Sequence, residues 1–294
     1  MKKFCSVLVL VVFFCCGALA QAAEQGYVEG AWDLNGVTGI NLSQTTLVNW
    51  SAGGENSMAG NIYLNGSLKH KTGDWLWVNT LVLEYGLSKV ESQGNRKTND
   101  NIDFSTQLGY SISDKWFFTG MGSFKTQFYN GYNYPDKDNY ISKFMAPAYS
   151  NLSLGVEFRP KSNYSLFASP ASGKFTFVQD DYLSELGAFG VNPGDKFRAE
   201  FGAYFKARAE QSVMENVNLI STVDLFTAYN KTFGDVDINW DVMISMKINK
   251  YLSASLNTTL KYDNDIKTFD DEGNQRGAKI QFKEILGVGF AYSF

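Results

Sequence analysis

The stretch DVDINWDVMISMKIN, residues 235–249, alternates apolar and polar side chains along its whole length. All of its even positions are apolar, and only Met243 interrupts the polar side. Successive side chains of an extended strand point to opposite faces, so this alternation predicts a strand with one apolar and one polar face. The stretch also exceeds the roughly 9–11 residues that a tilted strand needs to cross a bilayer.

The same alternation recurs along the chain and predicts twelve strands. Their expected spans are 36–47, 57–70, 75–87, 100–112, 116–129, 149–159, 163–170, 196–209, 213–229, 235–249, 251–262 and 277–294. The connections are short after each even-numbered strand and mostly long after each odd-numbered one. Short turns at one end, long loops at the other and an even strand number are typical of outer-membrane barrels. The sequence therefore predicts an all-β fold, a single antiparallel transmembrane β-barrel of about twelve strands.

Aromatic residues decide which face of these strands meets lipid. Alternation is shared with soluble β-sandwiches, which turn their apolar face inward and which stay an alternative at this point. Rings gather on the apolar side at the short-turn ends of the strands, at Trp75, Trp77, Trp116, Phe118, Tyr164, Tyr292 and Phe294. A second set lies toward the opposite ends, at Tyr85, Phe124, Phe128, Tyr229 and Tyr262. Two such belts are typical of the two membrane interfaces, so we expect the apolar face to meet lipid and the polar face to line a lumen.

The first residues have the pattern of a secretory signal peptide. Lys2 and Lys3 precede an apolar run, Val7–Phe14, and the small residues Ala18 and Ala20 follow. We expect residues 1–20 to be removed after Ala20, or alternatively after Ala23. Residues 21–35 would then be a periplasmic lead-in and residues 36–294 the barrel, in the outer membrane of a Gram-negative bacterium.

The last strand carries an expected assembly signal. It alternates aromatic residues and ends on Phe294. This pattern resembles the signal that the bacterial barrel-assembly machinery reads. We therefore expect that machinery and outer-membrane lipid as the partners of the chain.

Composition excludes several classes of site. The formal net charge is −4, with 26 basic and 30 acidic residues, which disfavours a nucleic-acid partner. All three cysteines, Cys5, Cys15 and Cys16, lie in the expected signal peptide, and His70 is the only histidine. We therefore expect no metal site, no cofactor and no catalytic residue.

The charged residues on the polar face are the candidate functional residues. Those expected to face the lumen are Arg198, Glu200, Lys206, Arg208, Asp224, Asp235, Asp237, Asp241 and Lys247. One strand carries the cations, and the strand two further along carries Asp235, Asp237 and Asp241. This pattern suggests a lumen split into a positive and a negative wall. That arrangement suits a narrow channel for small polar solutes. Charges that pair with one another would instead give a closed structural barrel, or one that binds a ligand or partner with its extracellular loops.

Three loops carry further expectations. The 171–195 segment contains Phe175, Phe177, Phe189 and Gly190, and we expect it to fold into or over the mouth as a constriction loop. The tyrosines of 130–140 offer stacking for a sugar or nucleoside, although a plain surface loop is the simpler interpretation. The acidic run Asp263, Asp265, Asp270, Asp271 and Glu272 is expected to be a solvated extracellular face, with a bound divalent cation as the alternative.

An outer-membrane hydrolase is the third interpretation. A lipase of this architecture would need His70 paired with a serine, and Ser67 and Ser88 lie nearby in the sequence. We expect His70 to be a residue of the periplasmic rim instead, because a catalytic histidine needs a positioned partner. A protease would need paired acids, for which Asp180–Asp181 and Asp103 are the candidates, but adjacent acids usually face water.

Five short motifs carry a resemblance to a known family. They are TQFYNGY (126–132), FMAPAY (144–149), SPASGK (169–174), GAFGV (187–191) and RAEFG (198–202). Together with the barrel pattern, they resemble the outer-membrane barrel family of Bacteroides-group bacteria known as domain of unknown function 3078, over roughly residues 30–294. The resemblance implies the fold and the location, and it implies no active site.

Overall fold

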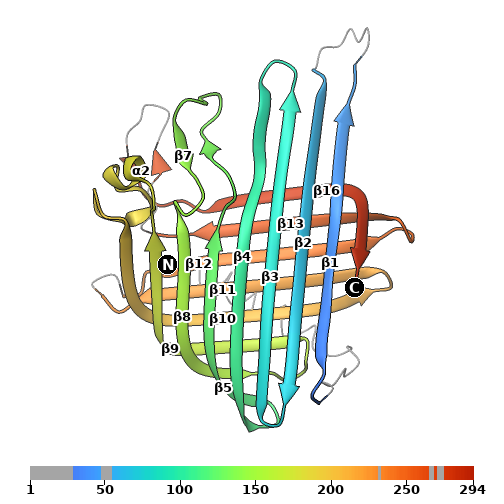
Figure 1. Ribbon diagram of the computed structural model, residues 1–294, viewed down its shortest axis with the longest axis vertical. Helices are drawn as coiled ribbons and strands as arrows, with labels where there is room; N and C mark the ends of the chain where they lie inside the picture. The colour runs from blue at the N-terminus through green and yellow to red at the C-terminus, as the bar shows by residue number, and fades with distance from the viewer. Residues whose placement is uncertain (1–28, 48–54, 231–232, 265–267, 270–274) are drawn as a thin grey trace.

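Twelve antiparallel strands close into one barrel (Figure 1). The computed structural model describes residues 29–47, 55–230, 233–264, 268–269 and 275–294. The expected signal peptide and the acidic positions Asp265, Asp270, Asp271 and Glu272 lie outside these residues. The barrel strands are β1 (Trp32–Thr45), β2 (Ser57–Thr72), β3 (Trp75–Val90), β4 (Gly94–Ser113), β5 (Trp116–Thr126), β8 (Ala148–Phe158), β9 (Tyr164–Phe177), β10 (Phe197–Met214), β11 (Val217–Ala228), β12 (Asp237–Lys247), β13 (Leu252–Tyr262) and β16 (Gln281–Ser293).

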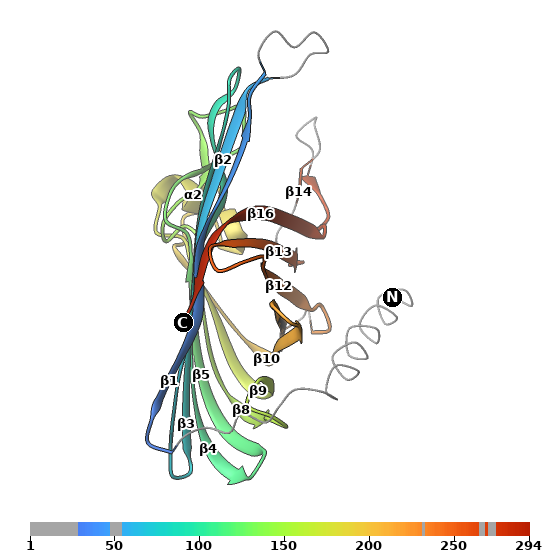
Figure 2. The ribbon, with the colours of Figure 1, turned by 90° about the vertical axis from the view of Figure 1, so that its right-hand side faces the viewer.

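Each strand pairs with the next one along the chain, and β16 pairs back to β1. One wall is formed by β1 to β5, and β10 to β13 run across it on the far side (Figures 1 and 2). The tight turns that follow β2 and β4 lie at one end of the barrel. At the other end lie two short hairpins, β6 (Gly131–Tyr132) with β7 (Tyr140–Ser142) and β14 (Thr268–Phe269) with β15 (Gln275–Arg276). The predicted topology is therefore confirmed.

The segment after β9 contains two short helices, α2 (Asp181–Glu185) and η2 (Ala188–Gly190). Figure 1 shows α2 beside β7, at the end of the barrel away from the tight turns. Among the described residues, no helix has both the length and the apolar character needed to cross a membrane.

The expected strands all exist, and the differences lie at their ends. The first strand begins at Trp32 instead of residue 36, and β4 begins at Gly94 because the expected loop 88–99 is mostly a paired hairpin. The expected strand 163–170 continues to Phe177. Proline lacks the amide N–H of a ladder hydrogen bond, so the pairing is interrupted at Pro170. The structure places Pro170 at register shifts of both neighbouring strands, so the pairing resumes beyond it.

The apolar side chains of the strands point outward. Ile62, Leu154, Phe201 and Leu286 are 52%, 58%, 60% and 69% exposed. The residues that alternate with them face inward and are mostly small or polar; Asn61, Ser67, Thr119, Ser153 and Ser255 are all buried. A soluble β-sandwich shows the opposite arrangement, so the sandwich alternative is excluded.

Exposed aromatic rings surround both ends of the barrel. Near the tight turns, the ring pairs Trp75–Tyr110, Trp116–Phe158 and Tyr292–Phe294 have centroid separations of 5.1, 4.7 and 6.2 Å. Trp77 and Phe118 are also exposed at this end, whereas Tyr164, expected in this belt, is buried and its hydroxyl donates to Gln211 Oε1. At the opposite end, Tyr85 contacts Phe128 at 6.3 Å and Phe201 contacts Tyr229 at 5.6 Å. His70 lies in the turn-side belt, stacked on Trp32 at 4.4 Å, with its Nδ1 3.1 Å from the Ala31 carbonyl.

The seam between β1 and β16 closes the barrel. Val37–Asn41 pairs with Gly289–Ser293, and Gly36 and Phe294 exchange backbone hydrogen bonds of 2.8 and 3.0 Å. The side chain of Asn41 points inward and donates to Ser255 Oγ at 2.9 Å. At Gly289 the strands approach so closely that a Cβ atom would overlap the backbone carbonyl of Ile40.

This close approach gives a testable prediction. We expect Gly289→Ala to lower the free energy of unfolding by about 1–3 kcal/mol, because the added methyl group forces the seam apart. The measurement is urea unfolding of the refolded barrel, followed by tryptophan fluorescence. Gly66→Ala on β2 is the matched control, since the nearest atom to its Cβ is Leu64 Cδ2 at 3.9 Å. Equal stability of the two variants would contradict the tight seam.

Candidate functional site

The charged residues of the polar face lie inside the barrel, with two exceptions. Arg198, Glu200, Lys206 and Arg208 on β10, Asp224 on β11, and Asp237 and Asp241 on β12 are partly buried and alternate with outward apolar residues. Asp235 lies before β12 and is exposed, where it accepts a hydrogen bond from Asn264 at 3.0 Å. Lys247 is the last residue of β12 and is exposed as well. Asp235 therefore lies outside the paired strand, whereas Lys247 pairs with Ser253 and lies at the rim on the inward side of β12.

Each cation of β10 has a carboxylate within 4 Å. Arg198 contacts Glu200 at 2.7 Å on the same strand, and Lys206 contacts Asp224 at 3.2 Å on β11. The hydroxyl of Tyr204 also donates to Asp224. Arg208 lies 3.7 Å from Glu210 and donates to Thr222 Oγ1 at 3.2 Å. Charges withdrawn from bulk water need such partners, since an isolated ion in a narrow lumen is strongly disfavoured.

Other ion pairs cross the lumen. Lys125 on β5 contacts Asp103 of β4 at 3.0 Å and Asp241 of β12 at 3.7 Å. Four strands lie between β5 and β12 in the ring, so Lys125 joins opposite walls. In the same way, Lys283 on β16 donates to Asn99 Oδ1 of β4 at 2.8 Å.

A third crossing contact lies nearer the end away from the tight turns. Lys174 on β9 contacts Asp237 at 2.6 Å and Asp263 at 3.2 Å. Asp263 was expected to be part of a solvated acidic face, but its side chain is only 18% exposed, because Lys174 holds it. Lys174 itself escaped sequence reasoning, since the strand was expected to end at Pro170. The alternating pattern of residues 172–176 is the signal that would have found it.

The expected division into a positive and a negative wall is wrong. Asp237 and Asp241 are held by Lys174 and Lys125, and the cations of β10 have their own carboxylates. Opposite charges are interdigitated, which narrows the lumen with ion pairs instead of leaving two opposed walls.

Two cavities remain between these pairs. The central chamber has a volume of about 90 Å³, and its charged lining includes Glu84, Asp103, Asp224 and Asp241. The turn-side chamber has a volume of about 30 Å³ and is lined by Lys69 and Arg159 as well as by turn residues such as Asn163. Both chambers share Thr80, Ser105, Lys206 and Arg208 as lining residues, so they adjoin each other. The lumen is thus rich in carboxylates at its centre and rich in cations toward the tight turns.

The expected constriction loop has a different structure. Phe175 and Phe177 belong to β9 and to its outward side, where both rings pack against Phe197 with centroids 6.0 and 5.2 Å away. Phe189 packs against a small apolar cluster of Ala146, Val178, Leu183 and Val191. The carbonyl of Gly190 accepts a hydrogen bond of 3.1 Å from Arg198 Nη1. The segment is therefore held against residues 140–147, and the two strand phenylalanines do not line the lumen.

Asp180 anchors this segment. Its carboxylate caps α2 by accepting from the Leu183 amide at 2.9 Å, and it contacts Lys143 at 2.6 Å and the Tyr140 hydroxyl at 3.1 Å. Burial opposes ionisation of the carboxyl, but the hydrogen bonds from Lys143, Leu183 and Tyr140 outweigh it and lower the pKa of Asp180. The expectation of a solvated pair holds for Asp181, which is 84% exposed, but it is wrong for Asp180.

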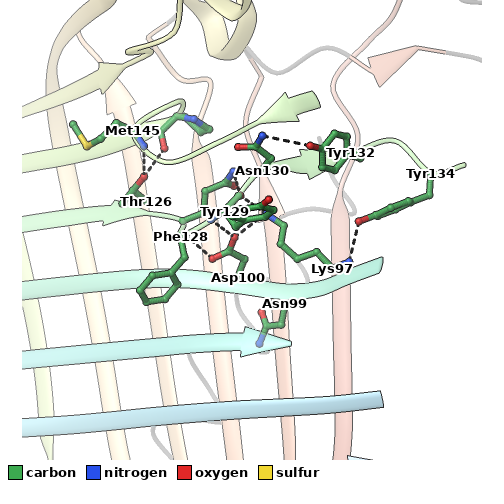
Figure 3. A network of polar contacts seen from close by, with 12 residues as sticks. Lys97, Asn99, Asp100, Thr126, Phe128, Tyr129, Asn130, Tyr132, Tyr134 and Met145 are labelled. Atoms are coloured by element: carbon green, nitrogen blue, oxygen red, sulfur yellow. Dashed lines mark hydrogen bonds and ion pairs between the residues drawn. The ribbon is translucent and has the colours of Figure 1, made fainter. Parts of the chain in front are cut away.

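A second anchor lies at the end of β4 away from the tight turns (Figure 3). The carboxylate of Asp100 accepts hydrogen bonds from the Phe128 amide at 2.7 Å, the Tyr129 amide at 3.0 Å and Lys97 Nζ at 2.7 Å. The hydroxyl of Tyr134 accepts from the Lys97 amide at 3.0 Å. These contacts explain the TQFYNGY motif as a loop held against β4. The ring of Tyr134 lies 5.3 Å from the Arg96 guanidinium, which covers part of its expected stacking surface.

The Lys125 bridge gives a stability prediction. We expect Lys125→Met to lower the free energy of unfolding by about 1–3 kcal/mol, because Asp103 and Asp241 lose their shared cation in a partly hydrated lumen. The measurement is again urea unfolding. Adding Asp241→Asn should restore part of the loss, and Lys89→Met, on an exposed side chain, serves as the control. Equal losses for Lys125→Met and Lys89→Met would contradict the bridge.

The Asp180 anchor gives a prediction for pH. Because the folded pKa lies below the unfolded value of about 3.9, the anchor stabilises the segment above that pH and weakens as the pH falls below it. The protection factors of the amides of residues 178–191, which correct for the intrinsic pH dependence of exchange, should therefore fall in acid. Asp180→Asn should show low protection at all pH values, and the control Asp181→Asn should behave as the native chain does. An acid response that survives in Asp180→Asn would assign it to another group.

Solved structures of similar outline are outer-membrane barrels. The translocator domain of autotransporter NalP from Neisseria meningitidis is 10% identical with a TM-score of 0.36, covering 91% of this chain and 90% of that one. An outer membrane channel from Pseudomonas putida F1 is 10% identical with a TM-score of 0.39, covering 94% and 100%. The NanC porin is 8% identical with a TM-score of 0.36, covering 87% and 98%.

Comparison of sequences adds one match. No curated protein matches the chain. A family model described as "Protein of unknown function (DUF3078)" matches residues 42–132. The resemblance to domain of unknown function 3078 is therefore confirmed over this part of the barrel, which runs from the end of β1 to β6.

Proposed function

We propose that the protein is an outer-membrane barrel that forms a narrow passage for small polar solutes and performs no chemistry of its own. The exposed apolar side of the strands and the two aromatic belts support a membrane location. Short turns at one end and longer connections at the other support the outer membrane of a Gram-negative bacterium, reached through the signal peptide expected at residues 1–20. Phe294 would serve the barrel-assembly machinery.

The pair of adjoining chambers is the observation that carries the proposal. Barrels of eight strands are filled by side chains and barrels of 16–18 strands hold a wide pore, so twelve strands leave an intermediate space. Here that space is lined by charged and polar groups, and the two chambers share Lys206 and Arg208. Asn257 Nδ2, which lines the central chamber, has no hydrogen-bond acceptor among the described residues.

The Lys125 bridge is the proposed constriction. It lies beside the central chamber, where Asp103 and Asp241 contribute to the lining. A solute must carry polar groups of its own to pass such a bridge, because breaking the ion pair without replacement leaves charges unpaired. Bulk flow of ions is therefore expected to be small.

The crossing ion pairs also favour a second candidate, a closed structural or partner-binding barrel. In that case Lys125, Lys174 and Lys283 would act only to hold the walls together. Removing one bridge would then lower stability without opening a path. The two candidates therefore differ in the effect that the loss of Lys125 has on conductance.

Single-channel recording separates them. Residues 21–294 are refolded and inserted into planar bilayers at two salt concentrations. We expect small, stable steps that scale with salt, and larger steps for the double variant Lys125→Met with Asp241→Asn, which removes the bridge without changing the net charge. Lys89→Met should leave the steps unchanged. A folded barrel that stays silent with and without the bridge would refute the passage and favour the closed barrel.

A further inference from the structure

We propose that the turn-side chamber is a binding site for a small oxyanion, of the size of phosphate or a carboxylate group, with Lys69 as its main ligand. The inference depends on the proposed function only for the path by which the anion enters. Binding itself is a property of the folded barrel and is measured without conduction.

Three separate elements bring cations to this chamber. Lys69 comes from β2, Arg159 follows β8, and Arg208 comes from β10. The charges that act on Lys69 are Glu210, Arg159, Arg208 and Asp33, so two cations and two carboxylates lie close enough to interact with it. The chamber extends to the turn residues Ser162 and Asn163, which places its opening at the end of the barrel where the tight turns lie.

Lys69 is the cation of this chamber that contacts no carboxylate; Glu210 and its cross-strand neighbour Asp33 act on it only at longer range. Arg159 contacts Glu157 at 2.7 Å, Arg208 lies 3.7 Å from Glu210, and Lys206 contacts Asp224 at 3.2 Å. Lys69, in contrast, has no ion pair or hydrogen bond from its ammonium group within the described part of the chain. A partly buried ammonium group without a carboxylate gains free energy from an anion at its side.

Neutral groups complete a setting for an oxyanion. The chamber is lined by the hydroxyls of Ser67, Ser105 and Ser165 and by the amide of Gln107, all buried residues. The Gln107 carbonyl oxygen accepts from Arg159 Nη2 at 3.1 Å, which fixes the guanidinium toward this wall. An ammonium group, a guanidinium group and hydroxyl donors are the combination that binds phosphate and carboxylate oxygens.

The charges of the central chamber confine the proposed anion to the turn-side chamber. Glu84, Asp103, Asp224 and Asp241 contribute to its lining and disfavour an anion there. An anion that enters from the turn side would therefore stop at Lys206 and Arg208, the boundary between the chambers. The passage would then have an anion-binding site on the turn side of its constriction.

The test is titration of the refolded barrel with inorganic phosphate, followed by calorimetry. We expect saturable binding, weakened about tenfold or more by Lys69→Met, since loss of one charge-assisted contact corresponds to at least a tenfold change. Lys69→Arg should retain binding, because it keeps the charge. Lys89→Met should bind as the native chain does.

A second variant keeps the test decisive if Lys69→Met fails to fold. Arg208→Gln removes another cation of the same chamber and should also weaken binding, whereas Lys125→Met, in the neighbouring lumen, should not. Competition by acetate distinguishes the source of the anion: full displacement indicates a site for any carboxylate, and weak displacement indicates preference for phosphate.

The outcomes separate this inference from the proposed passage. The anion site would be overturned if neither phosphate nor acetate bound saturably. It would also be overturned if folded Lys69→Met and Arg208→Gln bound phosphate as the native chain does. A barrel that binds phosphate but stays silent in bilayers keeps the site and loses the passage. A barrel that conducts but does not bind keeps the passage and loses the site.

Discussion

The closure of β1 on β16 is the constraint on which the rest of the structure depends. A bilayer offers no water to unpaired backbone groups, so a sheet can cross it only when every strand has two neighbours. Glycine at position 289 permits this closure, because the strands meet there without room for a Cβ atom. Closure fixes which side of each strand faces lipid, and the apolar residues follow that side around the whole ring.

The same closure determines the chemistry of the lumen. Charged residues turned away from lipid are brought within reach of the opposite wall, and few of them remain alone. Lys125 and Lys174 each hold two carboxylates and so join strands that are distant in the chain. Lys69 is the exception among the cations of the turn-side chamber. A lumen in which most charges are paired has little space for bulk flow, and a lysine without a contacting carboxylate would give the proposed anion its place.

Local patterns predicted most of the fold, and contacts across the ring account for the features they missed. Alternation revealed the twelve strands and their inward side, including Arg198, Lys206 and Asp224. It failed at Pro170, where a register shift in the neighbouring strands lets β9 continue and places Lys174 in the lumen. The partners of Asp180 and Asp263 lie 37 and 89 residues away in the chain, so a solvated loop was the natural expectation for both. Lys69 was missed as a candidate binding residue because its proposed role depends on residues distant in the chain, Arg159 after β8 and Arg208 on β10.

The outward apolar side and inward polar side are tested most directly by single cysteines along β12. Residues 21–294 contain no cysteine, so each introduced thiol can carry one fluorescent label. Labels at Ile244 and Met246 should be quenched by nitroxide lipids, and labels at Met243 and Ser245 should be quenched by iodide when water reaches them but never by lipid. Met243 is the critical position, because it is apolar and yet faces inward. Quenching by lipid at Met243 and Ser245, with Ile244 and Met246 protected, would contradict the barrel's orientation.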